Sequence, residues 1–131
     1  MMQRKTPTVV VIDNRPAVKT LFERSTENLD VELLIFTSAA DSRAYLETNK
    51  PDLLILNIIL PDKDGLILLK ELRKFPLHKD TSVVMVSSKD YAQDRIMATE
   101  LGALDFIPVP VPIKTIEDVV VKITKAKPST E

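Results

Sequence analysis

The chain has 131 residues, a net charge of −1 and no cysteine, and 44% of its residues are hydrophobic. This length suits one domain with a substantial core, while the charge offers no footprint for nucleic acid or a membrane surface. The missing cysteines exclude disulfides and thiolate metal sites, and two glycines are too few for a phosphate-cradling loop. Because no apolar run approaches about 18 residues, we expect a cytoplasmic domain (1–126) and then a polar tail or the start of a linker (127–131).

The first part of the chain predicts two strand-helix units. Thr8–Ile12 is an uninterrupted β-branched run, which is typical of a strand. Pro16 then opens a helix, since proline is tolerated in a first helical turn. A second strand is predicted at Val31–Phe36. Ser38 is a good N-cap for a second helix, which we expect to continue to about Thr48.

The middle of the chain predicts the central strand. The apolar run Leu53–Leu56 is bounded by Pro51 and Pro61 and is too short for an independent helix. It therefore indicates a strand that is buried on both faces. Asn57 follows at the carboxyl end of this strand, where open α/β sheets place their chemistry. A third helix is expected to begin at Gly65.

The last part of the chain predicts two further strands, at Ser82–Val86 and Asp105–Pro108. The fourth helix lies between them and is capped by Asp90 or a neighbour. Its inner face is assigned to Ile96, Met97 and Leu101. Pro112 is expected to start the last helix, which carries apolar residues at helical spacing. In the loop before the fourth strand, His78 is expected to be a solvated side chain without metal-binding neighbours.

Five strand-helix units imply an α/β fold with a parallel sheet covered on both faces. The segment from Asn57 to Gly65 also resembles the third strand and following loop of the receiver domain of two-component response regulators. That family's pattern is Asp-x-x-Leu/Met-Pro-x-x-Asp/Asn-Gly, and this chain matches it at Leu60, Pro61, Asp64 and Gly65. The resemblance covers about residues 9–125. It implies a flavodoxin-like (CheY-like) (βα)5 fold, a doubly wound parallel sheet with strand order 2-1-3-4-5.

The resemblance also implies which positions should carry the chemistry. In receiver domains two adjacent acids and the phosphoacceptor Asp bind Mg²⁺, and a Ser or Thr and a Lys bind the phosphoryl group. These positions fall on Asp13, Asn14, Asn57, Ser87 and Val109, so three of the five groups are replaced. An amide cannot form an acyl phosphate, and one remaining carboxylate is a weak Mg²⁺ candidate. We therefore expect a degenerate pseudo-receiver with no catalytic residue, no cofactor, and lost or weak Mg²⁺ binding.

The retained groups admit plainer interpretations. The segment Asp13-Asn14-Arg15-Pro16 is either a turn with N-capping side chains or a residual cation site. Ser87 is expected to bond a loop backbone. Phe106 stands where the family often has an aromatic residue whose rotamer follows phosphorylation. Without a phosphoryl group, it is either a fixed packing residue or part of a partner surface.

The segment from Pro108 to Pro112 is apolar and rich in proline. The Lys-Pro bond of the family is usually cis, so the resemblance implies a cis Val109–Pro110 bond. We take this rim, beside the fourth helix and fifth strand, as an interaction surface for a protein partner. A structural cap is the alternative. The proposed surface consists of Phe106, Val109, Pro110, Val111 and Pro112.

Three functional hypotheses follow. The first is a non-enzymatic signalling domain that works without phosphorylation and binds a protein through helix four, strand five and helix five. The second is a phosphorelay receiver that accepts phosphate through Asp62, Asp64 or a deamidated Asn57. The third is an apex that binds a neutral or anionic small molecule, for which the sequence offers no basic lining. None involves nucleic acid or a membrane.

Overall fold

The computed structural model describes residues 6–129. Its strands form one parallel sheet in the order β2-β1-β3-β4-β5, which confirms the predicted fold class and topology. The strands are β1 (Thr8–Ile12), β2 (Glu32–Phe36), β3 (Leu53–Asn57), β4 (Val83–Ser87) and β5 (Asp105–Pro108). The helices are α1 (Pro16–Thr26), α2 (Ala39–Thr48), α3 (Gly65–Arg73), α4 (Ala92–Glu100), α5 (Ile113–Thr124) and the short 3₁₀ helix η1 (Pro76–His78).

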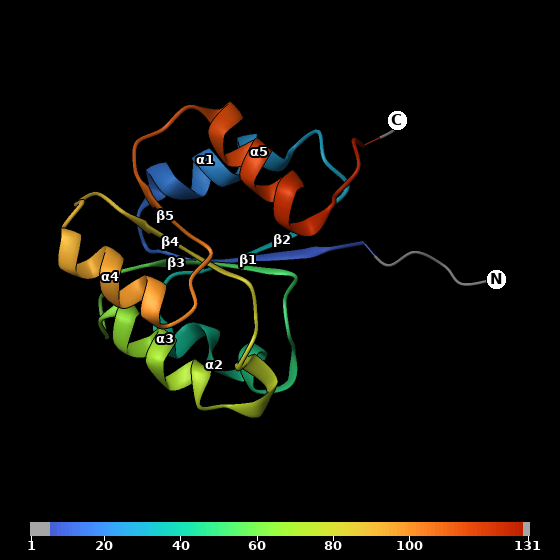
Figure 1. Cartoon of the computed structure of the whole chain (residues 1–131). Coiled ribbons are helices and arrows are strands. Elements are labelled where there is room, and N and C mark those ends of the chain that lie inside the picture. The colour runs from blue at the N-terminus through green and yellow to red at the C-terminus, as the bar shows by residue number, and fades with distance from the viewer. Residues whose placement is uncertain (1–5, 130–131) are drawn as a thin grey trace.

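The helices cover both faces of the sheet. Figure 1 shows α1 and α5 on one face and α2, α3 and α4 on the other. Side chains of each strand alternate between the two layers: Val10 and Leu54 belong to the core under α2–α4, whereas Val9 and Leu53 belong to the core under α1 and α5. Because β1, β3 and β4 are buried along their whole length, their sequences are nearly continuous apolar runs. No helix within residues 6–129 is long and apolar enough to cross a membrane.

The strand register brings the predicted site positions to one edge of the sheet. Ile12 lies opposite Leu56, so Asp13 and Asn57 follow neighbouring strand positions. In the β4–β5 pair, Ser87 lies opposite Pro108. The carboxyl ends of β1, β3 and β4 therefore place these three polar side chains at a common apex, as the topology requires.

Gly65 allows the loop after β3 to return against that strand's end. A Cβ atom at this position would lie 2.0 Å from the carbonyl oxygen of Asn57 and 2.9 Å from the Cα of Ile58. The Gly65 amide donates to the Ile58 carbonyl at 2.6 Å. Asp64 then caps α3, its carboxylate accepting from the Leu66 and Ile67 amides. Only glycine fits where the loop backbone passes this close.

The prediction of a solvated His78 was wrong. The ring is fully buried at the end of η1, with Nε2 2.6 Å from the Leu46 carbonyl oxygen and Nδ1 2.8 Å from the Thr81 hydroxyl. Because a carbonyl only accepts, Nε2 donates to Leu46, and Nδ1 forms the second hydrogen bond of the ring with the Thr81 hydroxyl. The charged neighbours Lys79 and Asp80, which suggested exposure, point to solvent while the ring ties the end of α2 to the start of β4.

The predicted inner face of α4 was also wrong in part. Ile96 and Met97 are 59% and 50% exposed, whereas Ala98 is 1% exposed and is the buried residue of this helix. Leu101 packs against the core as expected. The prediction assigned the largest apolar side chains to the buried face of α4, and this placed that face about one residue away from its actual position. The small Ala98 side chain is the one that faces the sheet.

The described part of the predicted polar tail is attached to the domain. Ala126 is buried, and the Asp30 amide donates to the Lys127 carbonyl at 2.7 Å. The Ser129 amide donates to the Asn28 carbonyl at 2.8 Å. Through residue 129 the chain therefore pairs with the loop after α1 and is not a free tail. The remainder of the predicted tail, and residues 1–5 of the predicted domain, lie outside the described residues.

Candidate functional site

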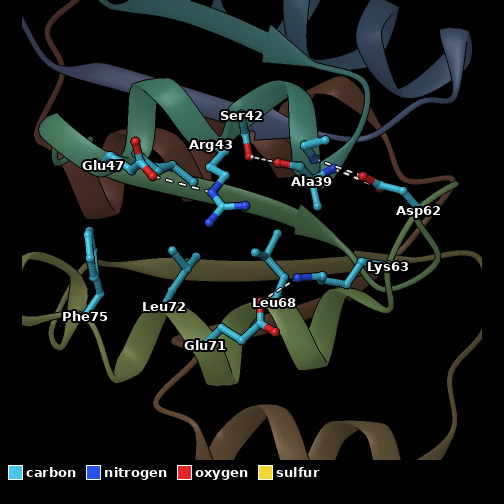
Figure 2. A pocket seen from close by; sticks show the side chains of 12 residues that line it. Ala39, Ser42, Arg43, Glu47, Asp62, Lys63, Leu68, Glu71, Leu72 and Phe75 are labelled. Carbon is cyan, nitrogen blue, oxygen red and sulfur yellow. Dashed lines mark hydrogen bonds and ion pairs between the residues drawn. The ribbon is translucent and has the colours of Figure 1, made fainter.

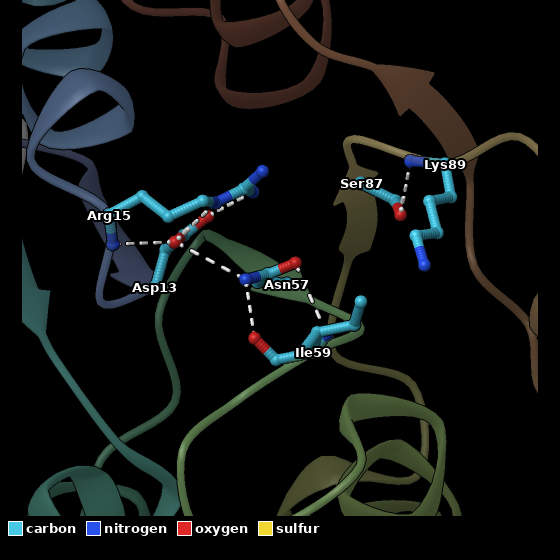
Figure 3. A network of polar contacts seen from close by, with 6 residues as sticks. All are labelled: Asp13, Arg15, Asn57, Ile59, Ser87 and Lys89. Carbon is cyan, nitrogen blue, oxygen red and sulfur yellow. Dashed lines mark hydrogen bonds and ion pairs between the residues drawn. The ribbon is translucent and has the colours of Figure 1, made fainter.

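The apex cluster consists of Asp13 after β1, Asn57 at the end of β3 and Ser87 at the end of β4 (Figure 3). Their exposed fractions are 2%, 3% and 1%. Asn14, the second acid position of the family, is exposed and follows Asp13 out of the cluster. Three of the predicted site positions are thus buried at the same edge of the sheet; Asp13 and Asn57 are hydrogen-bonded to each other, and Ser87 bonds the Lys89 amide.

Asp13 forms a bidentate ion pair with Arg15. Nε of Arg15 lies 3.0 Å from Oδ1 and Nη2 lies 2.6 Å from Oδ2. Figure 3 shows the guanidinium turned toward the carboxylate. The Arg15 backbone amide donates to the same Oδ1 at 3.0 Å. A carboxylate buried this deeply requires a nearby positive charge. The sequence analysis placed Arg15 in the turn after the first strand but did not predict its ion pair with Asp13, although a basic residue two positions after an acid indicates such a pair.

Both polar atoms of the Asn57 side-chain amide form hydrogen bonds, to the β3–α3 loop and to Asp13. Its Nδ2 donates to the Ile59 carbonyl at 2.7 Å and to Asp13 Oδ1 at 3.3 Å. Its Oδ1 accepts from the Ile59 amide at 3.3 Å. These contacts orient the amide, with its nitrogen toward Asp13. Asn57 therefore shapes the β3–α3 loop and donates to the only carboxylate of the apex cluster.

Ser87 contacts the backbone of the next loop. Its hydroxyl oxygen accepts from the Lys89 amide at 3.0 Å, which is the kind of bond expected from the sequence. Val109, at the family's Lys position, is buried, and its amide donates to the Ser87 carbonyl at 2.8 Å. The Val109–Pro110 bond is cis, as the resemblance implied. No cationic side chain stands at position 109.

The predicted interaction surface is only partly exposed. Phe106 and Val109 are 7% and 9% exposed, so they cannot serve as surface residues in this conformation. Pro110 and Pro112 are exposed, and Val111 is half-buried. Phe106 packs in the core layer under α2–α4 and Val109 in the layer under α1 and α5, because helices cover both faces of the sheet at β5.

Phe106 is buried in this structure. Its ring belongs to the core under α2–α4, and the Arg95 guanidinium lies 4.8 Å from the ring centroid. Arg95 also forms an ion pair with Asp90. The ring is therefore enclosed between the sheet and a charged side chain of α4.

The two acids considered as replacement phosphoacceptors both cap helices. Asp62 accepts from the Ala39 and Ala40 amides at 3.0 and 2.9 Å, at the start of α2. The hydrogen bonds from Ala40 and Ala39 lower the pKa of the Asp62 carboxyl below its usual value. Asp64 accepts from Leu66 at 2.7 Å at the start of α3. Both carboxylates satisfy backbone donors rather than joining the apex cluster.

The apex residues do not fit Mg²⁺. This ion binds through carboxylates and retained waters, and the family uses three acids for it. Here the corresponding side chains are one carboxylate, already paired with Arg15, and the amides of Asn14 and Asn57. Within residues 6–129, no group of three or more His, Cys, Asp or Glu side chains could hold a metal ion. While Asp13 is paired with Arg15, the donor set supplies too little negative charge for Mg²⁺.

A separate groove of about 490 Å³ lies between α2 and α3 (Figure 2). Leu46, Leu68 and Leu72 give it an apolar floor. Its rim carries two ion pairs, Arg43–Glu47 at 3.4 Å and Lys63–Glu71 at 2.7 Å. The groove shares no residue with the apex cluster. The groove and the polar residues of the apex cluster therefore lie in different parts of the domain.

The strand order and the polar cluster at the carboxyl edge define a doubly wound α/β protein of the flavodoxin-like class. The sequence profile of the response regulator receiver domain matches residues 9–121, so the chain belongs to that family. It is a receiver domain of two-component signalling.

Curated relatives are longer than this chain. It is 35% identical over 104 residues to the transcriptional regulatory protein CssR of Bacillus subtilis (strain 168), covering 79% of this chain and 44% of CssR. It is 29% identical over 102 residues to the alkaline phosphatase synthesis transcriptional regulatory protein PhoP of the same strain, covering 78% of this chain and 42% of PhoP. The chain therefore spans less than half of either relative.

Solved structures share the fold. A response regulator from Chloroflexus aurantiacus J-10-fl has a TM-score of 0.82 at 26% identity, over 92% of this chain and 99% of that one. The phosphorylated cyanobacterial phytochrome response regulator RcpA has a TM-score of 0.84 at 19% identity, over 96% and 100%. The receiver domain of sensor histidine kinase PA1611 from Pseudomonas aeruginosa PAO1, with magnesium coordinated in its active site cleft, has a TM-score of 0.80 at 14% identity, over 92% and 99%.

Proposed function

We propose that this receiver domain signals without being phosphorylated and acts by binding a protein partner. The observation that carries the proposal is Asn57 at the position of the phosphoacceptor Asp. An amide oxygen is a poor nucleophile because the nitrogen lone pair is delocalised, so it cannot form the acyl phosphate. The amide is also engaged with Ile59 and Asp13, which gives Asn57 a structural role.

The other replacements support the same proposal. Phosphoryl transfer depends on cations that neutralise the moving charge, and on groups that hold the arriving phosphoryl. The apex cluster has too few acids for Mg²⁺, and Val109 supplies no ammonium. Ser87 remains, but its hydroxyl bonds the Lys89 amide. We accordingly propose that the domain has no catalytic step of its own. We also propose the cytoplasm as its compartment, on the basis of the sequence, which has no cysteine and no apolar run of membrane-spanning length.

Phosphorylation can be tested directly. The protein is incubated with Mg²⁺ and acetyl phosphate, and in parallel with beryllofluoride, and intact mass is recorded. We expect no adduct on the wild-type chain. The variant Asn14→Asp/Asn57→Asp/Val109→Lys, which restores the three replaced groups, is the positive comparison. A phosphate adduct on the wild type, mapped by peptide fragmentation to Asp62, Asp64 or residue 57, would establish the second hypothesis instead.

We propose the β5 edge of the sheet as the partner surface. β5 is an edge strand, with α4 on one sheet face and α5 on the other. Apolar side chains are exposed along these elements, namely Ile96, Met97, Leu104 and Ile113, at 59%, 50%, 58% and 43%. Exposed apolar side chains that gather on neighbouring elements are typical of protein interfaces. Pro110 and Pro112 extend the same edge.

The partner surface is tested by capture from the native lysate with tagged protein. The variant Ile96→Glu/Met97→Glu should lose the captured partner. The matched control is Ile67→Glu, because Ile67 is 53% exposed but lies on α3. Loss with the control and retention with the double variant would move the interface away from α4.

A further inference from the structure

The carboxylate of Asp13 is buried. Its side chain is 1% exposed, whereas that of Arg15 is 29% exposed. An ionised carboxylate in such a position is stable only when it is paired and hydrogen-bonded. Both of its oxygens are in fact occupied: Oδ2 by the guanidinium, and Oδ1 by the guanidinium, the Arg15 amide and the Asn57 amide.

The arrangement is specific to the two residues and the short turn between them. Arg15 donates to Asp13 from its backbone and from two guanidinium nitrogens, and Asn57 adds one further hydrogen bond. The fork of a guanidinium matches the two oxygens of a carboxylate, which a lysine ammonium would not do. Arg15 also precedes Pro16, whose fixed φ begins α1 and holds the turn.

We infer that the Arg15 guanidinium supplies the positive charge that a divalent cation would otherwise have to supply to Asp13. The apex cluster is therefore neutralised from within the chain, and Arg15 excludes metal from it. This inference goes beyond the proposed function, since it concerns the counter-ion of a buried acid and not phosphate transfer. It is tested without any phosphodonor, so the two can fail separately.

The first experiment compares thermal unfolding of wild type, Arg15→Met, Asp13→Asn and Asp13→Asn/Arg15→Met in metal-free buffer. Arg15→Met leaves a buried charge unpaired, so its Tm should fall by at least about 5 °C. The double variant removes both charges and should recover a large part of this loss. The matched control is Arg43→Met, because Arg43 pairs with Glu47 on the surface and should change Tm little.

The second experiment detects weak cation binding by selective line broadening of backbone amide NMR signals with substoichiometric Mn²⁺. In wild type we expect no selective broadening at Asp13, Asn57 or Ser87. In Arg15→Met the freed carboxylate should attract the cation and broaden these signals. In Asp13→Asn/Arg15→Met the broadening should disappear, since the only carboxylate of the cluster is gone.

Three results would overturn the inference. Selective broadening of the apex signals in wild type would show that metal binds while Arg15 is in place. Absence of broadening in Arg15→Met would show that Arg15 is not what keeps the cation out. A double variant as unstable as Arg15→Met would show that the lost stability comes from packing of the Arg15 side chain and not from its charge.

Discussion

At the scale of single residues, the geometry of the apex cluster depends on how closely the loop before α3 approaches the end of β3. Gly65 sits against the end of β3, where the carbonyl of Asn57 leaves no room for a side chain. The same contact holds the loop that carries Ile59, to which the Asn57 amide is bonded. Both the geometry of the candidate site and the packing of α3 therefore depend on Gly65.

Replacing Gly65 by Ala should destabilise the domain strongly. The added Cβ would meet the Asn57 carbonyl at 2.0 Å, so backbone must move, and we expect a loss of about 3 kcal/mol. Gly102→Ala is the comparison: its φ is +82° but its Cβ would lie 3.5 Å from Arg73, so the cost should be about 1 kcal/mol. Urea unfolding measures both, and equal losses would contradict the steric explanation.

The residues of the site were predictable only where the family motif or the strand ends identified them. Asp13, Asn57 and Ser87 follow predicted strands, so their meeting at one edge followed from topology. Arg15 and His78 were missed, because their roles depend on partners that become neighbours only on folding. A charged residue after a strand and a histidine among polar residues both look solvent-exposed in a linear sequence.

At the scale of elements, helix termini use acids from outside the helix. The first amides of α2 are satisfied by Ser38, its own N-cap, and by Asp62 from the loop after β3. An ionised carboxylate also interacts favourably with the positive end of the helix dipole. Asp62 therefore connects α2 to the β3–α3 loop, beside the groove between α2 and α3.

This connection should depend on pH. Hydrogen bonds from Ala40 and Ala39 lower the pKa of Asp62 in the folded state below the usual value of 3.8. The ionised group therefore contributes stability that is fully present above pH 3.8 and is lost as pH falls through the lowered folded pKa. The stability difference between wild type and Asp62→Ala, measured by urea unfolding, should shrink over that range. Asp62→Asn cannot ionise, so its difference from Asp62→Ala should stay constant.

The exposed side chains of α4 offer a second prediction for this scale. Ile96→Glu and Met97→Glu should each change the free energy of unfolding by less than about 0.5 kcal/mol, because both side chains are half or more exposed. Ala98→Leu, on the buried face, should cost about 1–3 kcal/mol through overpacking. Chemical denaturation checks all three. A large loss at Ile96 would restore the helix phase predicted from the sequence.

At the scale of the whole molecule, a single sheet separates two apolar layers. The alternation of strand side chains sends Ile12 and Leu56 toward α2–α4, and Val11 and Ile55 toward α1 and α5. This organisation was predictable because five apolar runs alternate with helical patterns, and right-handed crossovers leave few strand orders. The attachment of the chain near Ala126 was not predictable, since its bonds to the loop after α1 are made by backbone groups.

The sheet should insulate the two layers energetically. Leu69→Ala acts on the layer under α2–α4 and should cost about 2–5 kcal/mol, while Ile116→Val acts on the layer under α1 and α5 and should cost about 0.5–1.5 kcal/mol. Because the two side chains share no partner across the sheet, the double variant should lose the sum to within about 0.5 kcal/mol. Urea unfolding of all four proteins gives the coupling directly. A coupling energy above about 1 kcal/mol would contradict this prediction and would mean that β1, β3 and β4 transmit packing changes between the layers. In that case α4 and α5, on opposite faces at the β5 edge, would be coupled through the sheet without any change at the apex.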